Sequence, residues 1–124
     1  RVGCCRIDFC VLSSVSKGEN MSYTSIATSR PGPRLQAAQT SEELGALMLE
    51  VWAVVNANGG ENTLTGTDFA RGVNISITNY PDVASSEKTV VELTAKQLIE
   101  FISTGPFMTL EDWMPIASAA MDGN

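Results

Sequence analysis

Asp68 and Arg71 are the residues whose types and spacing best fit a small polar site in this chain. An arginine three residues after an aspartate can orient the carboxylate as a general base, or help it hold a polar ligand. The same spacing also suits a local ion pair in which Asp68 caps a short turn. We therefore take Asp68, Arg71 and the large aromatic Trp113 as candidates for lining a ligand pocket.

The chain contains no histidine. This removes the commonest general base, the usual partner of a catalytic serine or cysteine, and the most frequent transition-metal ligand. Ser85 and Ser86 lie near Lys88, but neither Ser-x-x-Lys nor Gly-x-Ser-x-Gly occurs. The adjacent carboxylates Glu111 and Asp112 are explained by the start of a helix. The residue types therefore favour a protein that binds or assembles over an enzyme, and they predict no cofactor.

The three cysteines, Cys4, Cys5 and Cys10, all lie near the N-terminal end. An odd number of cysteines at one end does not form a disulfide framework for the rest of the chain. Their spacing, with no fourth Cys or His, is not a standard zinc pattern. We expect reduced thiols, no metal site and a cytoplasmic location, although a place in a virion or another assembly fits the same residues.

Charge is distributed unevenly along the chain. Residues 1–34 carry five basic and two acidic side chains, whereas residues 35–124 carry three basic and twelve acidic ones. An acidic body repels phosphate backbones, so we expect no nucleic acid to bind there. No apolar run approaches the roughly 18–20 residues that cross a bilayer, so we expect no membrane insertion.

Residues 1–34 are predicted to be a leader and an extended arm, and residues 35–124 one compact domain. The first part, residues 1–20, differs in composition from the rest and precedes Met21, so it is either an appended leader or an edge strand. Prolines at 31 and 33 disfavour helix in the arm, although residues 23–26 permit a strand. The arginines of the arm, Arg30 and Arg34, suit bidentate contacts with a partner, although a solvated linker explains them too.

The strongest predicted element is a helix over residues 41–57. Thr40 and Glu43 form a capping box at its start, and the sequence Asn-Gly-Gly at 58–60 ends it. The helix is apolar around most of its circumference and must be covered on several sides. Either the domain's own sheet encloses it, or a second copy does, which predicts a homodimer or higher oligomer. The candidate interface residues are Leu47, Met48, Val51, Trp52, Val55, Arg30 and Arg34.

The remaining elements are predicted from periodicity and capping. Residues 61–67 are predicted to be a loop. Alternating residues at 73–78 indicate a half-buried strand, and residues 89–93 are a second strand candidate after a loop across Ser85 and Ser86. Capping signals predict helices over 94–103 and 110–121. A single helix over 86–103, in a mostly helical domain, is the alternative.

Together these elements predict a small α+β domain in the order helix, strand, strand, helix, helix. We expect an interaction or structural module that self-associates and that can contact another protein. The alternative is a small-molecule binding domain, or an enzyme that uses carboxylates. In that case the pocket would lie between the sheet and the C-terminal helices.

Overall fold

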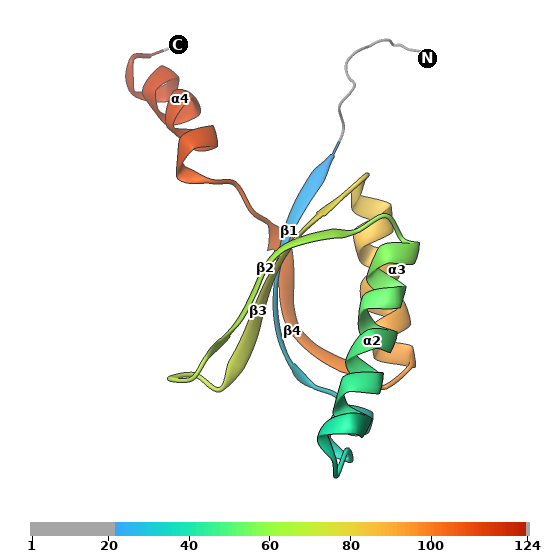
Figure 1. Ribbon diagram of the computed structural model, residues 1–124. Coiled ribbons are helices and arrows are strands. Elements are labelled where there is room, and N and C mark those ends of the chain that lie inside the picture. Colours follow the sequence, from blue (N-terminus) through green and yellow to red (C-terminus); the bar gives the residue numbers. More distant parts are fainter. Residues whose placement is uncertain (1–21, 124) are drawn as a thin grey trace, which may run out of the picture.

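The computed structural model describes residues 22–123, which form a small α+β domain as the sequence predicts. Two helices cover one face of a four-stranded antiparallel sheet (Figure 1). The cysteines at positions 4, 5 and 10 and the predicted leader lie outside the described residues. The strands are β1 (Tyr23–Pro31), β2 (Glu61–Asp68), β3 (Val73–Tyr80) and β4 (Ile99–Pro106). The helices are α1 (Pro33–Gln36), α2 (Ser41–Ala57), α3 (Val83–Ala95) and α4 (Leu110–Met121).

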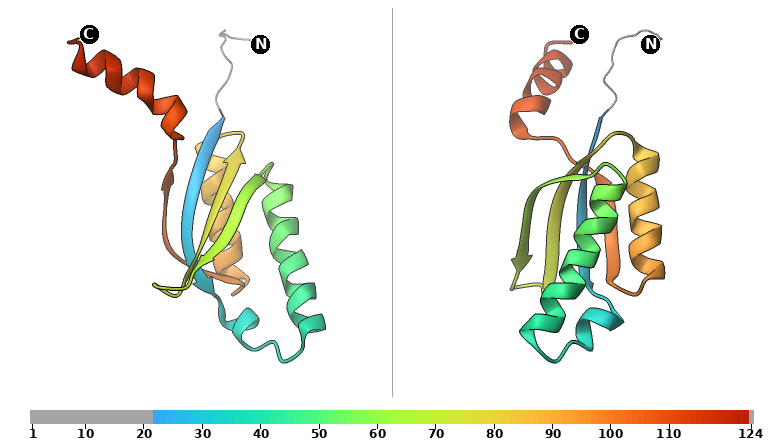
Figure 2. Two further views of the ribbon diagram at one scale, coloured as in Figure 1. Left: turned by 60° about the vertical axis from the view of Figure 1, so that its left-hand side comes forward. Right: turned by 45° about the vertical axis from the view of Figure 1, so that its right-hand side comes forward.

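The strand order, β2-β3-β1-β4, explains why both large helices lie on the same face of the sheet. The connection from β1 to β2 passes over β3, and the connection from β3 to β4 passes over β1. Each joins two parallel strands through a helix, and right-handed crossovers place both helices on one face. This is the split βαβ, or ferredoxin-like, arrangement. The last helix, α4, lies away from the two layers (Figure 2).

Residues 23–31 form the inner strand β1 and not the extended arm that the sequence predicts. β1 pairs with β3 from Tyr23, opposite Tyr80, to Ser29, opposite Asn74, and it pairs with β4 along its other edge. The compact part of the chain therefore begins ahead of the predicted boundary at residue 35. Prolines did not prevent this pairing because Pro31 ends the strand.

Helices α2 and α4 occupy the residues that the capping signals predict. The Thr40 hydroxyl accepts a hydrogen bond from the Glu43 amide at 3.0 Å, and the Glu43 carboxylate accepts one from the Gln39 amide at 2.8 Å. Gly59, with φ of 79°, follows the last turn of α2. The Thr109 hydroxyl accepts a hydrogen bond from an α4 amide at 3.1 Å. Among the described residues, no helix combines the length and apolarity that crossing a bilayer requires.

Three segments differ from the prediction. Residues 89–93 lie in α3 and not in a strand, residues 99–103 lie in β4 and not in a helix, and residues 61–67 form β2 and not a loop. The carboxylate of Asp82 caps α3 by accepting a hydrogen bond from the Ser85 amide at 2.7 Å. The hydroxyl of Thr89 donates to the Ser85 carbonyl at 2.9 Å, which lets this β-branched residue lie inside the helix.

The turn between α3 and β4 anchors the hydrophobic core. The Leu98 amide donates to the Leu93 carbonyl at 3.1 Å, and the Gln97 amide donates to the Thr94 carbonyl at 3.0 Å, which is a Schellman motif. Gln97 has φ of 60°, the left-handed conformation that usually belongs to glycine at this position. The motif brings Leu93 and Leu98 into the core beside three valines of α2: Val51, Val54 and Val55.

Gly32, which follows β1, contacts the same turn through its backbone. Its amide donates to the Leu98 carbonyl at 2.8 Å. A Cβ atom at Gly32 would lie 2.7 Å from the carbonyl oxygen of Gln97, so any side chain there would displace the turn. The end of β1 and the start of β4 are therefore held together by backbone contact.

Replacing Leu98 with alanine tests the core. Leu98 is fully buried, so Leu98→Ala should lower the free energy of unfolding by about 2–5 kcal/mol. Leu49 is 71% exposed on α2, and Leu49→Ala should change the free energy by no more than about 0.5 kcal/mol. Urea denaturation measures both. Equal losses would contradict the placement of Leu98 in the core.

Replacing Gln97 with glycine tests the strained turn. Gln97→Gly relieves the left-handed backbone and should raise the free energy of unfolding by about 0.5–1 kcal/mol. The neighbouring Lys96 has φ of −81°, so Lys96→Gly should instead lower it by a similar amount. Thermal or urea denaturation of the two variants should give opposite signs.

Candidate functional site

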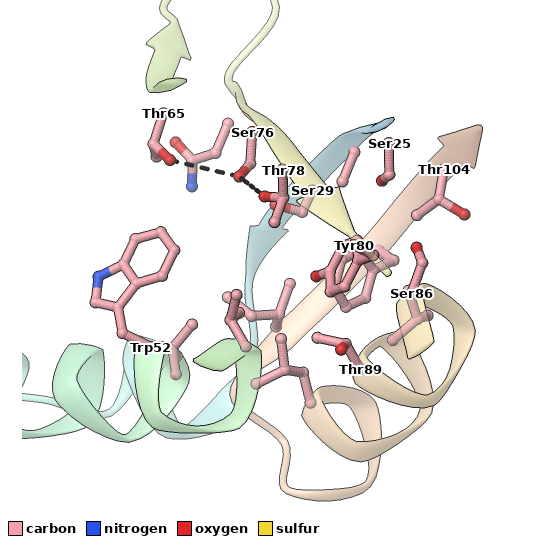
Figure 3. A pocket seen from close by; sticks show the side chains of 18 of the residues that line it. Ser25, Ser29, Trp52, Thr65, Ser76, Thr78, Tyr80, Ser86, Thr89 and Thr104 are labelled. Carbon is pink, nitrogen blue, oxygen red and sulfur yellow. Dashed lines mark hydrogen bonds between the residues drawn. The ribbon is translucent and has the colours of Figure 1, made fainter. Parts of the chain in front are cut away.

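The side of the sheet that faces the helices carries small side chains. β1 contributes Ser25, Ala27 and Ser29, and β3 contributes Ser76 and Thr78. These side chains occupy far less volume than the leucines and isoleucines that usually fill a core between a sheet and helices. A cavity of about 120 Å³ remains between the sheet and helices α2 and α3 (Figure 3).

The wall opposite these small residues is apolar. It is made by Val51, Trp52 and Val55 of α2 with Leu93 of α3, while Phe101 of β4 lies beside Ser29 on the sheet side. Among the residues that line the cavity there is no aspartate, glutamate, lysine, arginine or cysteine. The cavity therefore presents neutral hydroxyl groups on one side and hydrocarbon on the other.

Three of the hydroxyl groups are buried without a hydrogen-bond partner. Ser25, Ser29 and Ser86 are 5%, 7% and 2% exposed. None of the side-chain hydrogen bonds found among residues 22–123 uses their hydroxyl oxygens, although buried polar groups are nearly always paired. A buried hydroxyl left unpaired costs about 1–3 kcal/mol, so an occupant that pairs with these groups gains binding energy from them.

A second group of polar side chains lies toward β2 and is fully paired. The Asn62 amide donates to the Ser76 hydroxyl at 2.9 Å and to the Thr78 hydroxyl at 3.2 Å. The Thr65 hydroxyl donates to the Asn62 carbonyl oxygen at 2.9 Å. It also lies 3.4 Å from the Ser76 hydroxyl oxygen (Figure 3). This network holds one end of the lining in place.

The cavity opens at its β2 end. Thr65 is exposed, and Trp52 and Met48 of α2 are only half-buried. At the α3 end, by contrast, Ser86 and Thr89 are buried. A molecule that enters beside Trp52 would therefore meet the unpaired serines further inside.

Tyr80 is the titratable side chain of the lining. It is buried, and burial raises the pKa of its phenol above the ordinary value of 10.0, which a hydrogen bond with Thr89 only partly opposes. The phenol is therefore protonated at neutral pH and can donate a hydrogen bond.

The apolar residues of α2 that the sequence suggested for an interface are mostly enclosed by the chain itself. Val51 and Val55 are buried in the core, and Leu47 packs against it. Met48 and Trp52 line the cavity. The chain's own sheet therefore covers this apolar stripe of α2, as in the alternative of a helix enclosed by its own domain.

The two arginines near the end of β1 lie apart from the cavity. The guanidinium of Arg34 holds both carboxylate oxygens of Glu50, at 2.9 and 3.1 Å, and donates to the Lys96 carbonyl at 3.2 Å. The hydrogen bond with Arg34 is the main reason that the pKa of Glu50 lies below its ordinary value. Arg34 thus ties α1 to α2 within the chain, whereas Arg30 is exposed.

The residues that the sequence suggested for a ligand pocket do not line this cavity. Asp68 and Arg71 form an ion pair of 2.8 Å in the exposed turn between β2 and β3, and this hydrogen bond lowers the pKa of Asp68. The Asp68 carboxylate also accepts from the amides of Ala70 and Arg71, so its role is to close the turn. Trp113 lies on α4 and is 43% exposed.

This cavity lies between the sheet and helices α2 and α3, and no carboxylate lines it. A pocket between the sheet and the C-terminal helices stays a prediction. Within residues 22–123 no group of three acidic, cysteine or histidine side chains is placed to hold a metal ion.

Sequence reasoning missed the serines and threonines of the cavity, although the sequence carried a signal for them. Small residues alternate at 25, 27 and 29, and polar ones at 74, 76 and 78. On β3 the alternation predicts a half-buried strand whose polar side faces solvent. In the structure it faces the helices.

Comparisons with family models, curated proteins and solved structures give no match to this chain.

The raised pKa of Tyr80 predicts a loss of stability in alkali. Between the pKa of an unfolded tyrosine, about 10, and the higher value in the folded chain, the folded state binds more protons, so stability falls as pH rises. Denaturation at about pH 9 and about pH 11 measures how far the free energy of unfolding falls between the two. That fall should be smaller for Tyr80→Phe than for the unchanged chain. Tyr23→Phe is the matched control, and an equal effect of both variants would contradict this assignment.

Proposed function

We propose that this domain is a binding module for a small, uncharged molecule that has an apolar face and one or two hydrogen-bonding groups. The observation that carries the proposal is the set of three buried, unpartnered hydroxyls, Ser25 and Ser29 of β1 and Ser86 of α3, in a cavity whose other lining is largely apolar. Pockets of this kind, mostly apolar with a few placed polar groups, are typical of small-molecule sites.

The chemistry of the lining favours a neutral occupant. A charged group brought into the cavity would lose its hydration without meeting an opposite charge, which costs several kcal/mol. The net charge of −6 on the whole chain further disfavours anions. Hydroxyl, carbonyl or amide groups can instead pair with the serines.

The size of the cavity favours a molecule of about one ring. Its volume of about 120 Å³ is close to the roughly 150 Å³ of apolar cavities that take up benzene. A flat ring could lie between Trp52 and Val55 on one side and the small residues of β1 on the other, with its polar edge toward Ser29.

The lining supports binding better than catalysis. Nucleophilic catalysis by a serine requires a base within hydrogen-bond reach, and no lining residue supplies one. The phenol of Tyr80, with its raised pKa, is a poor general base near neutral pH. We therefore assign the serine hydroxyls to ligand recognition.

The proposal can be tested by titrating labelled protein with three ring compounds and following its amide chemical shifts. Phenol should bind with a dissociation constant of roughly 0.1–10 mM, because a ligand this small yields only a few kcal/mol. Benzene should bind more weakly because it leaves the serines unpaired, and benzoate should not bind because of its charge. The shifts should concentrate on β1, β3 and α2.

Two variants locate the binding in the cavity. Ala27→Leu fills the space and should abolish phenol binding, and Ser29→Ala should weaken it about fivefold, the value of one hydrogen bond. Ser103 lies opposite Thr28 on the other face of the sheet, so Ser103→Ala is the control and should change nothing. Equal binding of phenol by the unchanged chain and by Ala27→Leu would refute the proposal.

A further inference from the structure

The face of the sheet that turns away from α2 and α3 carries the isoleucines of β1 and β3. Ile26 of β1 lies opposite Ile77 of β3, and Leu64 of β2 lies on the other side of Ile77. Ile75 follows on the same face, since residues two apart on a strand point the same way. No helix of the described chain covers this face (Figures 1 and 2).

Two glycines inside the strands leave part of this face without side chains. Gly66 lies opposite Ile75, and Gly105 lies opposite Ile26. A Cβ atom at either position would meet no other atom within 4 Å. Glycine weakens a strand, and inside one it often marks a place where another backbone or a ligand approaches closely.

The C-terminal helix α4 is a second uncovered apolar surface. It makes no substantial contact with another element of the described chain, and the figures show it beyond the end of the sheet. The Phe107 amide donates to the Thr24 carbonyl at 2.9 Å, which holds the start of the connection at that end of the sheet. The exposed apolar residues of α4 and of the preceding segment are Met108, Leu110, Trp113, Met114, Ile116 and Met121.

We propose that these two surfaces bind each other between two copies of the chain, so that α4 of each copy lies on the uncovered sheet face of the other. One chain carries both an apolar helix and an apolar sheet face that no other element covers. In a two-fold dimer the same two surfaces meet twice, the helix of each copy on the sheet of the other. When each copy places its α4 on the sheet of the other, the apolar surfaces of both copies are covered without a third protein. The interface differs from the α2 stripe, which the chain covers itself.

The exposed area agrees with a dimer. The apolar side chains of α4 and its connection are between 43% and 86% exposed, and without Ile116, which points away from the others, they present on the order of 600 Å². A stable interface buries about 800 Å² on each partner. Leu64, which lies beside Ile77 and is 59% exposed, adds to this area on the sheet side.

The central part of the sheet face suits an apolar partner. Around the pair of Ile26 and Ile77 the paired residues on this face are neutral, including Thr28 and Ser103. Leu110, Trp113, Met114 and Met121 are three, four or seven residues apart and share one side of α4, whereas Glu111 and Asp112 lie off that side in the first turn. This apolar side is available for contact with the sheet.

Sedimentation velocity of the full chain from about 1 to about 100 µM tests the proposal. The unchanged protein should sediment as a dimer. Gly105→Glu places a charge in the interface, and its side chain begins in open space within its own chain. It should therefore weaken association at least 100-fold and leave the circular dichroism spectrum unchanged. Gly45→Glu, on the exposed side of α2 with equally open space, is the matched control and should remain dimeric.

Mixing two defective variants tests the reciprocal exchange. Gly105→Glu blocks the sheet face, and Met114→Glu blocks the apolar side of α4. A dimer formed by either variant alone therefore has two damaged contacts. A mixed dimer has one intact contact, because the good helix of one copy meets the good sheet of the other. The mixture should therefore form dimers at concentrations where either variant is monomeric. A monomeric unchanged chain, a dimer that survives Gly105→Glu, or a mixture that stays monomeric would each overturn the proposal.

Discussion

The distribution of side-chain size between the two faces of the sheet is the constraint on which the rest of the structure depends. Ser25, Ala27 and Ser29 face the helices, while Ile26 of the same strand faces away from them. A core normally gains most of its stability from large apolar side chains packed between the layers. Here the helices supply most of that hydrocarbon, and the small residues of the sheet leave the cavity.

The same constraint accounts for the uncovered face. Because neighbouring residues of a strand point to opposite sides, placing hydroxyls toward the helices places Ile26, Ile75 and Ile77 on the far side. A shift of the pairing by one residue would exchange the two sets. The proposed ligand site and the proposed dimer interface therefore share strands β1 and β3 but use alternate residues, so substitutions can alter one without touching the other.

Several polar residues that suggested chemistry instead determine local structure. Asp68 and Arg71 close the turn between β2 and β3, and Arg34 binds Glu50 to join α1 to α2. Their spacing is compatible with either role, and only their surroundings distinguish the two. Both ion pairs are partly exposed, so solvent screens them and they contribute little to stability. The groups that we assign to ligand recognition are serines and threonines without charge.

Elements whose signals are local could be predicted from the amino-acid sequence. Helices α2 and α4 were predicted over the observed residues, because a cap and the apolar spacing of a helix involve residues only three or four apart. Strand β3 was predicted from its alternation over 73–78. Only tertiary structure decided that residues 23–31 form an inner strand, that residues 89–93 are helical, and that 61–67 and 99–106 are strands. Strand pairing joins residues some 50 positions apart, such as Ile26 and Ile77, and a single sequence does not specify which strands meet. The cavity has the same origin, because its hydroxyls come from separate strands and from α3, and only the register of the sheet and the two crossovers bring them to one place.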